Sequence, residues 1–266
     1  HFTELSFKIH QLRGPITVFS RILMRLPNKL TANLVSFMYS SIETNGIDLI
    51  IAAGGKTAPY SAAIKVLNNI PVIQLGSPRG LHSSLFNALV TVERYYEDSS
   101  NIIASITPNL YSPEICSKAA TKKNLSEHLL FLIGGEGIGY AYKDQEWTSL
   151  VASIRNLYSK TSLPITIVTS RRSDPKVENI LQEGLTGIPL QYSAWFHQGD
   201  KDFNLAALLG SAKNVFVTED SAMMISEAIS SGRPVTTLFP SGIKSPMRYK
   251  APVSYTHLRA HETRHD

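Results

Sequence analysis

Cysteine and long apolar runs are both scarce in this chain of 266 residues. Cys116 is its only cysteine, which excludes an internal disulfide framework and a metal site built from several thiolates. So little cysteine is typical of a reducing compartment, and we expect the protein in the cytoplasm. No apolar stretch approaches the roughly 20 residues of a membrane-spanning helix, which leaves peripheral contact with a membrane surface open.

Charged residues are also few, and neither sign forms a run. They make up 18% of the chain, against 43% hydrophobic residues, and the net charge is +5. Basic residues stand as neighbours only at Lys122-Lys123 and Arg171-Arg172, which is not the basic stripe of a nucleic-acid-binding protein. The composition therefore predicts a globular protein that can bind small anions and does not bind nucleic acid.

Neither end of the chain resembles the end of a natural domain. The chain starts at His1, with no methionine, and is strand-like over residues 1–9. Residues 254–266 lack apolar periodicity and hold three of the eight histidines. Their spacing of four fits either a metal-binding helix or a non-native tail that resembles translated adapter sequence. We favour the tail and expect a fragment truncated at both ends.

Apolar runs alternate with amphipathic segments along most of the chain. Residues 46–53 and 128–133 are apolar runs apart from Asp48 and His128, and each is followed by Gly-Gly, as expected of strands buried on both faces. The apolar residues of 58–68 and 144–160 follow a helical spacing. Further strands are expected at 71–75, 86–92, 101–106, 164–169, 190–196, 214–218 and 234–239, and further helices at 175–183, 204–212 and 222–231. This alternation predicts βαβ units with parallel sheets.

A polar stretch interrupts this alternation at residues 116–127. We interpret it as an interdomain linker, or as a terminal helix leading into one. The predicted organisation is an incomplete Rossmann-like domain over 1–115, the linker, and an incomplete nucleotide-binding-like domain over 128–253, with separate parallel sheets. Ligands of such sheets bind at the carboxyl ends of the strands.

The turn after the strand that ends at Thr218 is the strongest candidate site. Asp220 or Ser221 can cap the following helix, and the free amides of a helix N-terminus bind phosphate well. Gly232 ends that helix. An ordinary βαβ unit explains the same residues without a ligand, and the spacing alone slightly favours that explanation.

The segment from Val217 to Val235 resembles the donor-binding segment of GT-B glycosyltransferases. In that family a serine-containing turn contacts the diphosphate and a glutamate of the next helix binds ribose. The resemblance implies that Ser221 and Ala222 form the turn and that Glu227 is the ribose-binding acid.

Four motifs in order resemble a narrower family. They cover residues 53–59, 132–136, 168–172 and 217–227, and the resemblance extends over about residues 47 to 240. The family is the mitochondrial fission "elongated mitochondria" family, whose bacterial members carry the label nucleoside-diphosphate-sugar epimerase. The resemblance implies a GT-B-like fold. It also implies either nucleotide-sugar binding or, as in the plant namesake, action with dynamin-related proteins at the mitochondrial surface.

Other strand-ending turns carry phosphate-binding chemistry. Four glycines within 134–139 permit close backbone approach to a ligand, and Glu136 there is either a hydroxyl ligand or a solvated acid. Arg171 and Arg172 suit phosphate recognition, or they are solvated surface cations. Predicted nucleotide- or phosphate-binding residues are Gly134, Gly135, Glu136, Arg171, Arg172, Ser221, Ala222 and Glu227.

A second glycine turn, at Gly54, Gly55, Lys56 and Thr57, lacks the spacing of a P-loop. It is either an anion nest, with Lys56 as its charge, or a plain turn with Thr57 as a helix cap. His82 and His197 lie near turns and could be general bases, but nothing in their spacing singles out a catalytic residue, and no metal or cofactor is expected.

We therefore predict a glycosyltransferase-like protein that binds a nucleotide sugar, with an unknown acceptor, in an interdomain cleft. The alternative is a non-enzymatic adaptor of the mitochondrial-fission type.

Overall fold

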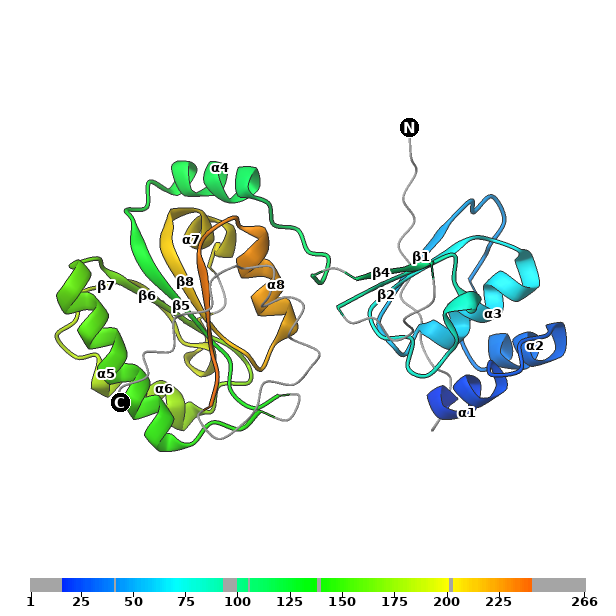
Figure 1. Cartoon of the computed structure of the whole chain (residues 1–266), viewed down its shortest axis with the longest axis horizontal. Coiled ribbons are helices and arrows are strands. Elements are labelled where there is room, and N and C mark those ends of the chain that lie inside the picture. The colour runs from blue at the N-terminus through cyan, green and yellow to red at the C-terminus, as the bar shows by residue number, and fades with distance from the viewer. Residues whose placement is uncertain are drawn as a thin grey trace. The chain divides into compact units, whose positions relative to one another are not determined.

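The structure is a computed structural model that describes residues 16–40, 42–92, 100–104, 106–137, 140–200 and 203–240. The strand-like start and the 254–266 tail lie outside these residues. The chain forms two compact units, His1–Ser105 and Ile106–Asp266, and each is described by itself (Figure 1).

The first unit is a four-stranded parallel sheet with helices on it. Its strands β1 (Ile50–Ala53), β2 (Val72–Leu75), β3 (Ala88–Thr91) and β4 (Ile102–Ala104) pair in sequence order. Helix α3 (Ala58–Asn68) has the predicted bounds. Helices α1 (Ile16–Leu23) and α2 (Lys29–Phe37) were not predicted. Asn28 begins α2 by accepting hydrogen bonds from the amides of Leu30 and Thr31, both at 2.9 Å.

Buried aromatic residues hold these helices to α3. The rings of Tyr39 and Tyr60 stack with centroids 4.9 Å apart. The Tyr60 hydroxyl donates to the Ser40 carbonyl and accepts from the Ile42 amide. Both rings are almost fully buried, and the hydroxyls satisfy their hydrogen bonds at the edge of the core.

The second unit is a five-stranded parallel sheet with helices on both faces. Its strands are β5 (His128–Ile133), β6 (Ile165–Thr169), β7 (Leu190–Ala194), β8 (Ala212–Thr218) and β9 (Val235–Leu238), in the order β7-β6-β5-β8-β9. Its helices are α4 (Pro113–Lys123), α5 (Asp144–Thr161), α6 (Pro175–Gly184), α7 (Leu205–Ser211) and α8 (Ala222–Ser230). The strand order reverses between β5 and β8, where doubly wound sheets open a crevice for ligands.

Strand β5 is central and every residue in it is buried, as its apolar run predicts. Leu130 and Leu132 join one hydrophobic core with residues of α7 and α8, whereas Leu129, Phe131 and Ile133 join another with residues of α5 and α6. Because successive side chains of a strand point to opposite faces, one run fills both cores. The prediction of separate parallel sheets is confirmed.

The position of the predicted linker differs from the structure. Residues 116–123 belong to α4, which packs against α7 in the second unit, and the division between the units falls at Ser105 and Ile106. Ser112 caps α4 by accepting from the Ile115 amide at 3.3 Å. Only Cys116 of α4 is buried, so the sequence carries little of the apolar pattern of a packed helix.

Candidate functional site at the carboxyl edge of the second sheet

A pocket of about 410 Å³ opens at the carboxyl ends of β5, β6 and β7. It is lined by the loops after these strands and by the first turns of α5 and α6. The lining residues are Gly135, Glu136, Tyr142, Asp144, Trp147, Arg171, Arg172, Ser173, Asp174, Pro175, Lys176, Val177 and His197. Parallel strands place all of these loops on one edge, as the sequence pattern predicts.

Four of the predicted binding residues share this pocket. Gly135 and Glu136 come from the loop after β5, and Arg171 and Arg172 from the loop after β6. Arg171 and Glu136 are exposed. Lys176 pairs with Asp144 at 2.5 Å, so its charge is balanced, whereas no ion pair is seen for Arg171 among the described residues. Arg171 is therefore the pocket cation best placed for an anion.

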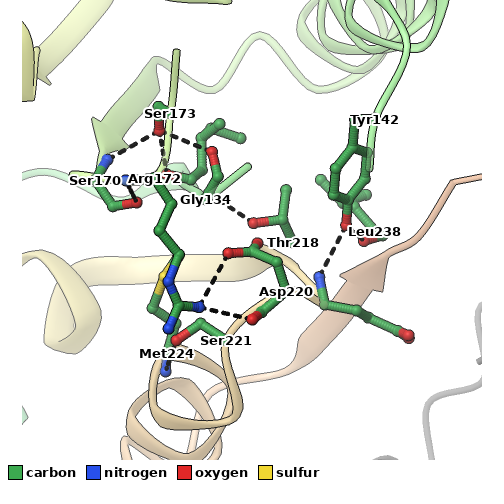
Figure 2. A network of polar contacts seen from close by, with 12 residues as sticks. Gly134, Tyr142, Ser170, Arg172, Ser173, Thr218, Asp220, Ser221, Met224 and Leu238 are labelled. Carbon is green, nitrogen blue, oxygen red and sulfur yellow. Dashed lines mark hydrogen bonds and ion pairs between the residues drawn. The ribbon is translucent and has the colours of Figure 1, made fainter. Parts of the chain in front are cut away.

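Arg172 ties the β6 loop to the turn after β8 (Figure 2). Its Nη1 donates to the Asp220 carbonyl at 2.6 Å and lies 3.3 Å from Asp220 Oδ2. Asp220 is fully buried, and its Oδ1 has no hydrogen-bond partner within the described structure. A buried carboxylate needs such a cation, so this pair fixes the guanidinium at the pocket wall.

The glycines after β5 are required by close packing against this pair. A Cβ on Gly134 would lie 2.1 Å from Asp220 Oδ1, and a Cβ on Gly135 would lie 2.1 Å from the Arg172 carbonyl oxygen. A Cβ on Gly137 would lie 3.0 Å from the Asp220 carbonyl oxygen. Gly139 lies outside the described residues. These glycines let three loops meet, and only Gly135 among them lines the pocket.

Ser173 joins the loop after β5 to the loop after β6 by hydrogen bonds. Its Oγ donates within 2.8–2.9 Å of the carbonyl oxygens of Gly134 and Ile133, and it accepts from the Ser170 amide at 3.0 Å. The Ser173 carbonyl lies 2.6 Å from His197 Nε2. A carbonyl only accepts, so Nε2 carries a proton and donates this hydrogen bond. His197 thus lines the pocket, whereas His82 caps a short turn in the first unit.

An aromatic wall closes the other side of the pocket. The rings of Tyr142 and Trp147 lie 4.8 Å apart, and the Tyr142 hydroxyl donates to the Leu238 carbonyl and accepts from the Glu219 amide. Burial, reinforced by the nearby Asp220 carboxylate, raises the pKa of Tyr142 well above its usual value. The hydroxyl stays neutral and joins β9 to the pocket wall.

Helix α8 starts next to this network, outside the lining of the pocket. Ser221 is its N-cap and accepts from the Met224 amide at 3.4 Å. Ser221 is buried and Ala222 half-buried. Since the side chain of Ser221 already occupies the helix end, the diphosphate role of Ser221 and Ala222 stays a prediction.

Glu227 lies further along α8 and does not line the pocket. It is half-buried, and it lies close enough to Tyr111 to raise the pKa of that phenol, after burial itself. Burial also raises the pKa of the Glu227 carboxyl group. Its ribose-binding role likewise stays a prediction.

The raised pKa of Glu227 predicts a pH-dependent stability. The folded state holds this proton more tightly than the unfolded state, so the stabilisation is complete below the unfolded pKa and is lost as pH rises through the folded pKa. Glu227→Gln cannot ionise. We expect it to raise the melting temperature relative to wild type at neutral pH more than at mildly acidic pH, as followed by tryptophan fluorescence. If the difference in melting temperature between Glu227→Gln and wild type is the same at neutral and mildly acidic pH, the prediction is contradicted. Glu183→Gln, at an exposed position, is the control.

The Gly54–Thr57 turn of the first unit follows β1. The Thr57 hydroxyl donates to the carbonyls of Ala53 and Gly54 at 2.8 and 2.7 Å, and it makes no cap bond to an amide. Thr57 is therefore the N-cap by position, as expected, but its side chain makes no capping hydrogen bond. Gly55 packs against the Arg79 side chain. The anion-nest role of Gly54, Gly55, Lys56 and Thr57 stays a prediction.

Several residues of the site were not singled out from the sequence. Asp220 was considered only as a cap, and Ser173, Tyr142 and Trp147 were not considered as site residues. The signal that could have pointed to Asp220 is an acid two residues after a buried strand, in a sheet where another strand ends in a double glycine.

A family model described as "Mitochondrial fission ELM1" matches residues 3–261 of the chain. The chain belongs to this family. The predicted family is thus confirmed. The match includes residues 254–261, which the sequence analysis set aside as a tail.

Among curated relatives of this ELM1-family protein, the uncharacterized protein RP120 of Rickettsia prowazekii (strain Madrid E) is 25% identical over 238 residues. That alignment covers 74% of this chain and 66% of RP120, so the chain spans just under two thirds of that relative's length.

Two solved structures are similar in fold. Escherichia coli heptosyltransferase WaaC, solved with ADP-2-deoxy-2-fluoro heptose, has a TM-score of 0.46 at 13% identity, over 89% of this chain and 70% of WaaC. The UDP-GlcNAc 2-epimerase of Neisseria meningitidis, bound to UDP-GlcNAc, has a TM-score of 0.46 at 15% identity, over 91% and 70%. The protein is an α/β protein with two parallel sheets, as predicted.

No helix in the described part of the chain is both long and apolar enough to cross a membrane.

Proposed function

We propose that this ELM1-family protein is glycosyltransferase-like and binds the nucleoside diphosphate part of a nucleotide sugar in the pocket of its second unit. The observation that carries the proposal is the convergence of Arg171, Arg172 and the Gly135–Glu136 loop on one pocket. A planar guanidinium binds phosphate oxygens in pairs. The pocket volume lies in the range of small-molecule sites. A position for this site in an interdomain cleft stays a prediction.

The pocket supplies a complementary surface for each part of such a ligand. Arg171 offers positive charge, and Arg172, whose charge is paired with Asp220, offers the N–H groups other than Nη1. The amides of Gly135 and Glu136 are engaged by no hydrogen bond within the described residues. Glu136 offers a carboxylate to ligand hydroxyls. Tyr142 and Trp147 provide an apolar wall for a base or sugar ring. The N-terminus of α6 is a second place where a phosphate could bind, but Asp174 already caps it by accepting from the Lys176 amide. The diphosphate is therefore assigned to the arginines and the glycine loop.

We expect Arg171→Gln to weaken binding of uridine diphosphate about ten- to a hundredfold, measured by titration calorimetry. A hydrogen bond to a charged group contributes roughly 1.5–3 kcal/mol, which corresponds to that change in affinity. Arg171 is exposed, so its loss should leave the fold intact. Lys160→Gln removes an equal charge from the opposite end of α5 and should leave affinity unchanged.

The same titration separates the competing assignments. Adenosine and guanosine diphosphates compared with the uridine form would show which base the wall selects. Glu227→Ala tests the ribose role implied by the resemblance, and an unchanged affinity would remove Glu227 from the site. Absence of binding to all three nucleotides would contradict the proposal and leave the adaptor hypothesis in its place.

A further inference from the structure

Helices α1 and α2 and the turn between them present a row of large apolar side chains to solvent. Seven are exposed, and we call them the α1–α2 apolar face: Val18, Phe19, Ile22, Leu26, Leu30, Leu34 and Phe37. The exposed fractions of Leu26, Leu30 and Phe37 are 76%, 70% and 86%. So many large apolar side chains along two adjacent helices mark an interaction surface.

The spacing of these residues places them on one side of each helix. In α1, Val18 and Ile22 are four residues apart, and in α2 Leu30, Leu34 and Phe37 follow the same helical period. Leu26 lies in the turn between the two helices. Other positions of the same segments, Met24, Ala32 and Val35, are fully buried in the core of the first unit. Helix α2 therefore has one apolar stripe for the core and a second one exposed to solvent, and α1 has an exposed apolar stripe beside the partly buried Leu23.

The two outward stripes belong to a single surface of the first unit. Helices α1 and α2 follow one another in the chain, contact one another and both pack against α3 (Figure 1). Because their inner residues pack into the same core, the exposed residues lie on the solvent side of this helix pair. With 8 and 9 residues, both helices are suited to lie on a membrane and are too short to cross it.

Positive charge accompanies the apolar face. Arg21, Arg25 and Lys29 lie among its residues, and no aspartate or glutamate occurs between residues 16 and 42. Arg25 and Lys29 are exposed. Apolar side chains flanked by arginine and lysine are the composition of helices that lie in the interface of an anionic membrane.

We propose that the α1–α2 apolar face docks this protein on an anionic lipid bilayer. Leu26, Leu30 and Phe37 insert between the lipids, while Arg25 and Lys29 contact the headgroup phosphates. A second copy of the chain is a poorer occupant, because a symmetric interface would bring the same positive side chains of both copies together without an acid from this segment to balance them. Charge complementarity thus selects the bilayer.

Vesicle flotation of the full chain tests this proposal. Vesicles of phosphatidylcholine with phosphatidylglycerol should bind the protein, vesicles of phosphatidylcholine alone should bind it far less, and added salt should release it. The triple variant Leu26→Ser, Leu30→Ser, Phe37→Ser should lose at least roughly tenfold in binding, since each side chain forfeits apolar burial. Arg25→Gln with Lys29→Gln should lose about fivefold per charge.

Matched controls separate docking from a general loss of apolar or basic residues. Leu110→Ser removes an equally exposed leucine from the second unit, and Lys122→Gln with Lys123→Gln removes two exposed charges from α4. Both should bind vesicles like wild type. All of these positions are exposed, so melting temperatures should stay unchanged.

Three results would overturn the proposal. One is wild-type protein that does not float with anionic vesicles. Another is a triple serine variant that binds as well as wild type. The third is a dimer in light scattering that the triple variant dissolves while vesicle binding is absent, which would assign the face to a second copy.

Discussion

Gly134→Ala should destabilise the second unit by at least about 2 kcal/mol. The new Cβ would lie 2.1 and 2.3 Å from the two carboxylate oxygens of Asp220, which no packed structure tolerates. Asp220 is fully buried and its position is fixed by Arg172, so the carboxylate has to move and the ion pair is strained. Overpacking of a tight interior costs roughly 1–3 kcal/mol, occasionally more, and disturbing a buried ion pair adds to this.

Tryptophan fluorescence during denaturant unfolding measures this effect selectively. Both tryptophans of the chain, Trp147 and Trp195, are buried in the second unit. The same variant should lose nucleotide affinity, because Arg172 lines the proposed pocket.

A double-mutant cycle identifies the physical cause. Asp220→Ala alone leaves the Arg172 guanidinium without its partner and should be destabilising. Gly134→Ala with Asp220→Ala removes the clash, so the double variant should be less destabilised than the sum of the single variants. Simple additivity would show that Gly134 is needed for a reason other than contact with Asp220.

Gly210→Ala should also destabilise the second unit by about 2 kcal/mol or more. Gly210 lies in α7, and a Cβ there would sit 2.0 Å from the carbonyl oxygen and 2.4 Å from the carbonyl carbon of Cys116 in α4. Alanine favours an isolated helix over glycine by about 1 kcal/mol. The clash involves backbone atoms that cannot rotate away, so α4 has to shift from α7 and overpacking outweighs the propensity gain.

Urea unfolding followed by the same tryptophans measures the change. Ser153→Ala on the exposed side of α5 is the control and should change stability by less than about 0.5 kcal/mol. A Gly210→Ala variant that is more stable than wild type would show that α4 is free to move, and would contradict a tight contact between α4 and α7.

The sequence predicted most of the second unit because its elements are defined locally. The buried run at 128–133 can only be a central strand, and the amphipathic spacing of 144–160 fits one helix, which the structure extends to Thr161. Alternation of strands and helices then requires parallel pairing. Helices α1 and α2 escaped prediction, and α4 was expected only as an alternative to a linker, because their apolar patterns are incomplete or two-sided and only packing shows which face is buried.

Half of the predicted binding residues meet in one pocket for the same topological reason. Parallel strands end on one edge, so the loops that carry Gly135, Glu136, Arg171 and Arg172 had to open on the same side. Sequence spacing cannot give the distances between such loops, because these depend on which strands are neighbours and on helix packing. Ser221 and Glu227 lie at the start of and within the helix that follows β8 of the same sheet, yet neither lines that pocket.

The sequence by itself determined the family, the α/β class and the strand edge that carries the candidate site. Only the tertiary structure decided that Asp220 is a buried partner of Arg172 and that α4 belongs to the second unit. It also showed that a side chain at Gly134 would clash with the Asp220 carboxylate, and that α1 and α2 keep an apolar face in solvent. The reason is physical: strand and helix patterns are local, whereas burial and ion pairing depend on segments that are distant in sequence and meet only in the folded chain.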